Sequence, residues 1–193
     1  MKQIFLILSI IICMMSPTIG IYSILKGKFK PQRMTRFLLL LVSFLFMGTL
    51  LAQGDRNAIY SIFVIFLGNL IIFLLSIKRG IGGTTKLDYC VLSMAILSLI
   101  IWRVSNNPVL GLTMSIITNF IAFLPTISKS WTKPETEEWR VYAFYVLASI
   151  FTILSLSSYT YGKLASSVYV IFMNGTIASL IIFRKKYLKN NHS

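Results

Sequence analysis

Residues 4–36 read IFLILSIIICMMSPTIGIYSILKGKFKPQRMTR, an apolar run followed at once by a basic segment. The apolar run, residues 4–25, approaches the roughly 20 residues that an α-helix needs to cross about 30 Å of hydrocarbon. Two more runs, residues 58–77 and 164–183, have a similar length and composition. We therefore expect membrane-spanning helices at these three places.

Four shorter apolar blocks lie between these runs, each bounded by charges, Pro, Asn or Gly. They are residues 37–52, 87–104, 109–127 and 141–159. Tilting and flanking polar residues allow such blocks to span as well. Because 56% of the 193 residues are hydrophobic and only 12% are charged, one soluble core of this size cannot hold them all. The sequence predicts an all-α integral membrane protein with about seven transmembrane helices.

The Lys and Arg residues are distributed unevenly along the chain. Most of them follow the first, third, fifth and seventh apolar block, and only Lys2, Arg56, Arg103 and Lys163 lie at the other ends. Basic residues concentrate in cytoplasmic loops. We therefore expect the N-terminus outside and the C-terminus in the cytoplasm, in a cytoplasmic (inner) membrane. Six or eight spans would break this alternation.

The start of the chain also resembles a secretory signal peptide, because Lys2 precedes the apolar run. No small-x-small cleavage site follows that run, and the basic segment behind it holds this end inside. We therefore expect a retained first helix.

The net charge of +14 raises the question of nucleic-acid binding. Such binding requires basic side chains on one water-facing surface near aromatic platforms, and here they separate apolar blocks instead. The expected partners are the lipid bilayer and a small-molecule solute, with no nucleic acid; assembly into a homo-oligomer stays open.

The residue types that usually serve in catalysis or metal binding are few in this sequence. The five acids lie outside the middles of the expected helices, the single His is His192, and no paired carboxylates or metal-ligand motif is present. We read Cys13 and Cys90 as small apolar thiols. No enzyme activity, metal or cofactor is expected, and the absence of a carboxylate or His from the middles of the runs favours passive movement of a solute over proton coupling.

Two parts of the sequence match each other. Residues 17–19, Pro-Thr-Ile, recur as residues 125–127, and residues 63–79 align without a gap on residues 169–185. Each repeat would hold three helices, an odd number, so an extra helix is needed to turn the second copy the same way up. The expected plan is a 3+1+3 arrangement of two parallel three-helix bundles. Its parts are residues 1–80, a linker helix in 81–105, residues 106–187, and a polar, frayed tail of residues 188–193.

This plan resembles the SWEET and PQ-loop superfamily of membrane transporters, as a distant bacterial-type member. Residues 16–19 and the loop 26–28 resemble the first helix and loop of SWEET proteins, and residues 124–129 with Lys133-Pro134 resemble the PQ-loop signature. Thr18 and Thr126 stand where Gln is usual. The resemblance implies a substrate site between the two bundles. The second helices hold no Trp, which SWEET sugar pockets usually contain, so a sugar is not the assured substrate.

Candidate gating and binding residues follow from these patterns. Pro bends a helix because it removes a backbone hydrogen bond, so Pro17 and Pro125 are hinge candidates; alternatively each marks the last turn of its helix. Asn69 and Asn174 are polar groups deep in apolar runs, and each should face a cavity or a partner. Interhelical bonding is the alternative. Weaker lining candidates are Tyr60, Tyr169, Ser43 and Ser149.

The acids Glu135, Glu137 and Glu138 precede the apolar block 141–159. We expect a solvated loop that complements the N-terminal end of the next helix, with a gate ion pair as the alternative. The sequence as a whole predicts facilitative transport, as a uniporter, of a small polar solute such as a sugar or an amino acid by alternating access. The other hypothesis is a non-transporting membrane receptor or assembly factor on the same scaffold.

Overall fold

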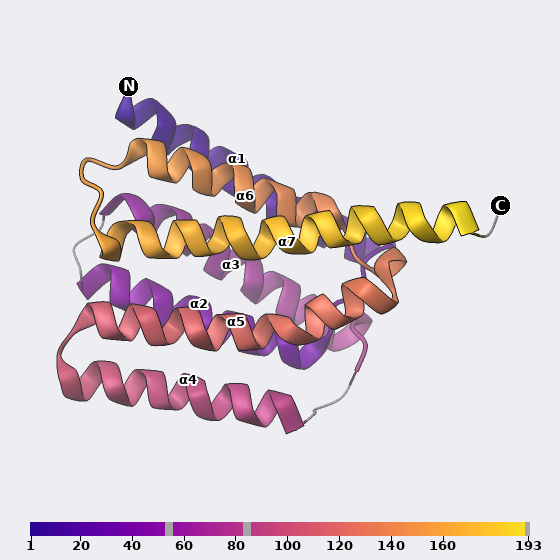
Figure 1. The fold of residues 1–193 in the computed structure, drawn as a ribbon, viewed down its shortest axis with the longest axis horizontal. Coiled ribbons are helices and arrows are strands. Elements are labelled where there is room, and N and C mark those ends of the chain that lie inside the picture. Colours follow the sequence, from indigo (N-terminus) through magenta and orange to yellow (C-terminus); the bar gives the residue numbers. More distant parts are fainter. Residues whose placement is uncertain (53–55, 83–85, 192–193) are drawn as a thin grey trace.

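The computed structural model describes residues 1–52, 56–82 and 86–191, which form an all-helical fold (Figure 1). Its elements are α1 (Lys2–Leu25), α2 (Arg33–Ala52), α3 (Arg56–Arg79), α4 (Lys86–Ser105), α5 (Pro108–Thr132), the 3₁₀ turn η1 (Pro134–Thr136), α6 (Trp139–Ser155) and α7 (Tyr161–Asn191). Successive helices run in opposite directions, so the two termini lie at opposite ends of the molecule (Figure 1). The end where α1, α3, α5 and α7 finish carries most of the Lys and Arg residues, and we call it the basic end.

The predicted apolar blocks fall on these helices. Residues 4–25, 58–77 and 164–183 correspond to α1, α3 and α7, and the shorter blocks correspond to α2, α4, α5 and α6. Helix α7 continues beyond its apolar run because Arg184 donates to the carbonyl of Trp131 at 3.1 Å and Lys185 donates to the carbonyl of Glu137 at 2.8 Å. Residues 83–85, near the start of the expected linker segment 81–105, lie outside the described residues.

Apolar side chains cover the outside of this fold, and small polar ones lie inside it. Ile7, Phe44 and Phe172 are 57%, 57% and 65% exposed, whereas Ser9 and Thr118 are fully buried. Four segments of the described chain are long and apolar enough to cross a membrane, namely α1, Ile62–Arg79 of α3, α5, and Tyr161–Asn190 of α7. Together the spans and the large apolar surface indicate an all-α protein associated with a membrane.

Six of the helices form a closed ring. Helix α3 lies between α1 and α2, α7 lies between α5 and α6, and the two groups meet where α1 packs on α6 and α2 packs on α5. Helix α4 lies outside the ring against α5 and α2. The contact between α1 and α6 uses small polar residues: Ser9 donates to the carbonyl of Ala148 at 2.9 Å and Ser16 to that of Val141 at 2.6 Å. Small residues allow such close approach of helices in membranes.

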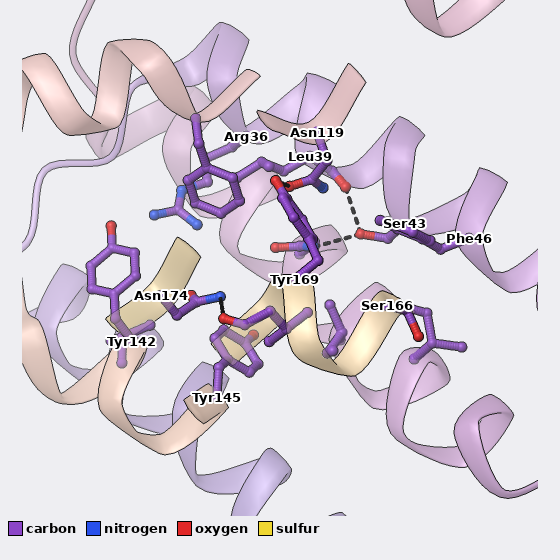
Figure 2. Close-up of a pocket in the computed structure, with 16 residues that line it drawn as sticks. Arg36, Leu39, Ser43, Phe46, Asn119, Tyr142, Tyr145, Ser166, Tyr169 and Asn174 are labelled. Atoms are coloured by element: carbon purple, nitrogen blue, oxygen red, sulfur yellow. Dashed lines mark hydrogen bonds between the residues drawn. The ribbon is translucent and has the colours of Figure 1, made fainter. Parts of the chain in front are cut away.

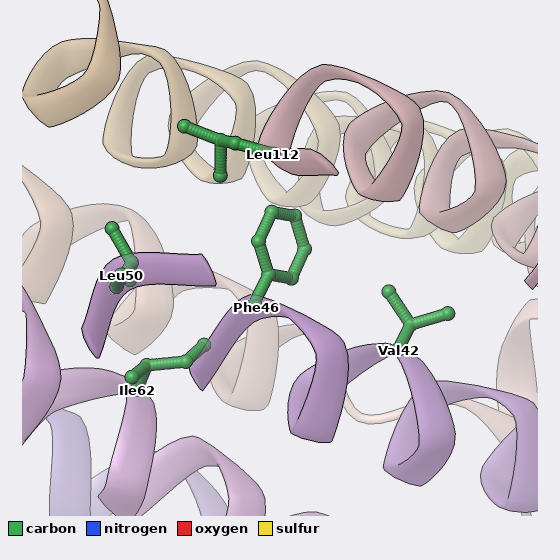
Figure 3. Packing of buried hydrophobic residues seen from close by; sticks show 5 residues of the cluster. All are labelled: Val42, Phe46, Leu50, Ile62 and Leu112. Carbon is green, nitrogen blue, oxygen red and sulfur yellow. The ribbon is translucent and has the colours of Figure 1, made fainter. Parts of the chain in front are cut away.

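Two apolar clusters hold the ring together at different heights. The first joins α2, α3 and α5 (Figure 3), and its buried members are Val42, Phe46, Leu50, Ile62 and Leu112. The second joins α6 and α7 nearer the basic end, and its buried members are Val141, Tyr142, Ile177, Ala178 and Ile181. Between them the ring encloses a more polar interior.

Candidate functional site

A cavity lies inside the ring of helices (Figure 2). It contains about 670 Å³ of space, part of it open to solvent, and 16 residues of α2, α3, α5, α6 and α7 line it. Its polar side chains are hydroxyl and amide groups and one guanidinium, that of Arg36. Pockets with a mostly apolar lining and a few polar groups are the usual form of small-molecule sites. We call it the central cavity.

Asn69 of α3 lines the central cavity and is 7% exposed. Its Nδ2 donates a hydrogen bond of 2.6 Å to Oγ of Ser43 on α2, and Ser43 in turn donates to the carbonyl of Leu39. Ser43 is also part of the cavity wall. The pair therefore combines the two roles expected for Asn69, because it joins α2 to α3 and also presents polar atoms at the cavity.

Asn174 of α7 lines the same cavity from the other group of helices and is 5% exposed. Its Nδ2 donates to the carbonyl of Val170, one turn earlier, at 2.9 Å. Because this bond stays within α7, it does not tie the helix to a neighbour. The structure thus places both asparagines in the wall of one cavity, and their role in binding a solute stays a prediction.

Tyr169 and Asn119 form a second polar pair in the wall. The hydroxyl of Tyr169 on α7 donates to Oδ1 of Asn119 on α5 at 2.7 Å. Asn119 is 8% exposed and lines the cavity, although sequence analysis did not single it out. It has no equivalent in the repeat pattern, and only its polar character within an apolar run could have drawn attention to it.

Ser149 and Tyr60 lie elsewhere. Ser149 lines a smaller cavity, which adjoins the central one because both share Ile62, Ile65 and Ser166 in their walls. This smaller cavity lies toward the end of the molecule opposite the basic end. Tyr60 is 55% exposed on α3 and belongs to neither wall.

The two hinge candidates occupy different environments. Pro17 is buried inside α1, and a Cβ added to Gly68 of α3 would lie only 2.6 Å from its Cβ. Pro125 is half-buried inside α5, two residues beyond Phe123, which lines the central cavity. Each proline leaves a backbone carbonyl of its helix without the usual hydrogen bond. Whether either helix bends there during function stays a prediction.

A cluster of charged and aromatic side chains lies at the basic end of the cavity. Glu137, 3% exposed, pairs with Nζ of Lys129 at 2.8 Å and accepts a hydrogen bond of 2.8 Å from the hydroxyl of Tyr142. The ring of Phe29 lies 5.1 Å from the guanidinium of Arg36 and 5.8 Å from Nζ of Lys129. Arg36 and Tyr142 also line the cavity. We call these five residues the basic-end cluster.

The cluster corrects the expectation of a solvated loop before α6. Glu135 is exposed, as expected, but Glu137 and Glu138 are buried. The reason is that η1 folds the loop back under α5 and α7, where Lys129 and Lys185 bind Glu137. Nothing in the local sequence indicated this burial, because all of these contacts depend on the packing of distant helices.

Glu138 differs from its neighbour because its partner is at the surface. It precedes α6, accepts a hydrogen bond of 3.5 Å from the backbone N–H of Arg140, and pairs with the Arg140 guanidinium at 2.8 Å. The hydrogen bonds from that guanidinium lower the pKa of Glu138 below its ordinary value. Glu138 therefore caps the helix in its charged form.

Comparison with known protein families, curated proteins and solved structures finds no match to this chain. The resemblance to the SWEET and PQ-loop superfamily therefore stays a prediction that rests on the residues quoted above. The features of the structure that bear on function are the central cavity and the basic-end cluster beside it.

Proposed function

We propose that this protein is a facilitative membrane transporter for a small polar solute, which it moves by alternating access between two three-helix bundles. The observation that carries this proposal is the central cavity, whose walls hold hydroxyl and amide groups from both groups of helices, with a buried ion pair near its basic end. In this account the chain crosses the membrane seven times in a 3+1+3 plan, with the basic end in the cytoplasm.

The pattern of helix contacts supports the two-bundle plan. If α1, α2 and α3 are exchanged with α5, α6 and α7, the main contacts within the groups and between them stay the same. Helix α4 is the one left without a counterpart, as the linker of such a plan would be. Transporters built from parallel repeats hold their substrate at the interface of the repeats.

The basic-end cluster supports a gate. Nζ of Lys129, on α5, donates to the carbonyl of Lys30 in the loop after α1 and also binds Glu137. The bond to Lys30 connects the two proposed bundles at this end, whereas the pair with Glu137 lies within the second bundle. At the other end the adjoining cavity extends the central one, and its walls hold hydroxyl and apolar side chains. The conformation fits a state that is closed toward the basic end.

The chemistry of the lining supports passage of a solute over its conversion. Of the described residues that line the central cavity, none is Asp, Glu, His, Cys or Lys. General acid–base catalysis most often uses such groups, and the Ser and Tyr hydroxyls of the wall would need an adjacent base to act as nucleophiles, which the described lining does not offer. A proton-coupled carrier would also need a titratable group there. We therefore propose passive transport without a covalent step.

Uptake into proteoliposomes tests this proposal. Purified protein, with its folding verified by thermal unfolding, is reconstituted and offered labelled sugars, amino acids and nucleosides. We expect at least one class to enter down its gradient, and Asn69→Ala to slow that entry. Failure of every class would contradict transport and favour a non-transporting receptor or assembly factor, for which Asn69→Ala would be tolerated.

A further inference from the structure

A positive charge faces the central cavity, and no carboxylate of the described lining balances it. We propose that the solute carries a carboxylate or a phosphate group, and that Arg36 recognises this anion. The inference rests on the proposed function of the central cavity as the solute site, and it narrows the substrate class from polar solutes in general to small anions.

Arg36 is placed where a ligand would meet it. It lies near the start of α2, is 7% exposed, and lines the cavity beside Tyr142. In Figure 2 the guanidinium of Arg36 and the ring of Tyr142 lie on one side of the cavity, and Ser43, Phe46 and Ser166 lie on the other. The ring of Phe29 packs at 5.1 Å from the guanidinium and restricts its movement.

The acidic residue of the basic-end cluster is already engaged by other groups. Both carboxylate oxygens of Glu137 are bound, Oε1 by Lys129 and Oε2 by Tyr142, each at 2.8 Å. Within the described residues two ion pairs form, Lys129–Glu137 and Arg140–Glu138, and neither includes Arg36. The charges of Lys129 and Glu137 cancel, so the cluster keeps one net positive charge, that of Arg36.

A buried guanidinium without a carboxylate is costly unless another anion compensates it. Arg presents a planar fork of N–H donors that fits a carboxylate or a phosphate with two parallel hydrogen bonds. An anionic solute in the cavity would supply this partner. The cost of burying an uncompensated guanidinium and the hydrogen-bonding geometry of Arg therefore both favour an anionic ligand.

The rest of the wall limits what the anion is attached to. The amides of Asn69, Asn119 and Asn174 offer neutral hydrogen-bonding groups, and Phe46 and Ile62 offer apolar contacts farther from Arg36. One guanidinium balances one negative charge. The solute is thus a small anion with a polar body, such as a hydroxy acid, an acidic metabolite of similar size, or a sugar monophosphate, the last of which carries between one and two negative charges near neutral pH.

Matched pairs of probes test the inference. Proteoliposomes of phosphatidylcholine are given lactate or lactamide, nicotinate or nicotinamide, and glucose 6-phosphate or glucose, and binding of each probe is measured in parallel by the shift in unfolding temperature. We expect the anion of at least one pair to bind and enter at least tenfold better than its neutral partner. Arg36→Gln should remove most of this preference, and Arg36→Lys should retain part of it.

The control is Arg103→Gln on α4, which makes the same change of charge at an exposed residue outside the ring. It should leave the preference for the anion unchanged. If neutral probes enter as well as anions, or if Arg36→Gln preserves the preference, the inference is overturned while transport stands. If anions bind through Arg36 and nothing enters, transport fails while the inference stands.

A lipid headgroup offers the same chemistry as a soluble phosphate, so a further set of vesicles contains phosphatidylglycerol. If all soluble probes fail to bind in either lipid and phosphatidylglycerol alone stabilises the protein through Arg36, the anion is a lipid headgroup and the solute inference is overturned. If no anion of any kind binds, the inference is overturned as well.

Discussion

The hydroxyl of Tyr142, a residue of the cavity wall, donates a hydrogen bond of 2.8 Å to Oε2 of Glu137, whose other oxygen pairs with Lys129. A side chain that faces the cavity is thereby joined directly to the ion pair that we propose as the gate at its basic end. Any ligand that displaces Tyr142 would disturb the closure, so occupancy of the cavity and opening of that end are mechanically linked in our account.

Loss of the charge on Glu137 should destabilise the protein strongly. Glu137→Gln keeps the shape of the side chain but leaves buried Lys129 without its counter-ion, a change that costs about 3–5 kcal/mol. Thermal or denaturant unfolding in detergent measures it. The matched control is Arg140→Gln, which breaks the more exposed pair with Glu138 and should cost less than about 1 kcal/mol. Equal losses for the two variants would contradict the buried position of Glu137.

Removal of the Tyr142 hydroxyl should act through the same carboxylate. Tyr142→Phe keeps the ring in its apolar cluster but deletes a hydrogen bond to a charged group, which is worth about 1.5–3 kcal/mol. In the double variant with Glu137→Gln the two losses should not add, because the residues share one interaction. Strict additivity in unfolding experiments would argue that the bond is absent in solution.

The contact of Pro17 with Gly68 predicts a difference between two glycines. Gly68→Ala would press its new methyl group against Pro17 at 2.6 Å, whereas the nearest atom to a Cβ at Gly175 is 3.9 Å away, on Val146. Overpacking of this kind costs about 1–3 kcal/mol, and we expect Gly175→Ala to stay within about 0.5 kcal/mol of the parent. The unfolding temperatures of both variants check this. A Gly68→Ala protein as stable as Gly175→Ala would refute the close packing of α1 on α3.

Tyr169 and Tyr60, both predicted from the sequence to line the solute site, should differ in their effect on the rate of transport. Tyr169→Phe leaves Oδ1 of Asn119 without its donor in the cavity wall, and a penalty of about 1–3 kcal/mol on solute binding would lower uptake at subsaturating solute by about fivefold or more. Tyr60 is exposed on the outer face, so Tyr60→Phe should transport at the parental rate. Initial uptake rates in proteoliposomes decide the matter. Equal rates for the two variants would exclude the Tyr169 pair from the solute site.

Much of the fold follows from local sequence. Long apolar runs with basic ends indicate where helices form and in which direction each one runs. Asn69 and Asn174 lie deep in two matching runs, and both line one cavity. In the ungapped match Asn69 aligns on Gly175 and Gly68 on Asn174, an offset of one residue, yet both asparagines line the same cavity.

The charged part of the site could not be predicted in the same way. Arg36 is the last residue of the basic segment before the apolar block 37–52, where the sequence indicates a loop. In the structure it lies near the start of α2 and lines the cavity. Glu137 is buried only because α5, α7 and η1 meet around it. The local sequence around a charged residue at the end of an apolar run is the same whether that residue is solvated or buried against a partner. Tertiary packing decides which of the two occurs.

Thiol labelling tests the central claim, a solvent-filled cavity closed at the basic end, most directly. Ser166 lines both cavities, so Ser166→Cys is introduced into a protein with Cys13→Ala and Cys90→Ala, with Ile177→Cys in the dry core as the control. Sealed vesicles then receive a membrane-impermeant thiol reagent on either side. We predict that Ser166→Cys reacts from the side opposite the basic end, that Glu137→Gln adds reaction from the basic side, and that Ile177→Cys stays unlabelled. Absence of labelling at Ser166→Cys from both sides in folded protein, or labelling from the basic side alone, would contradict the account.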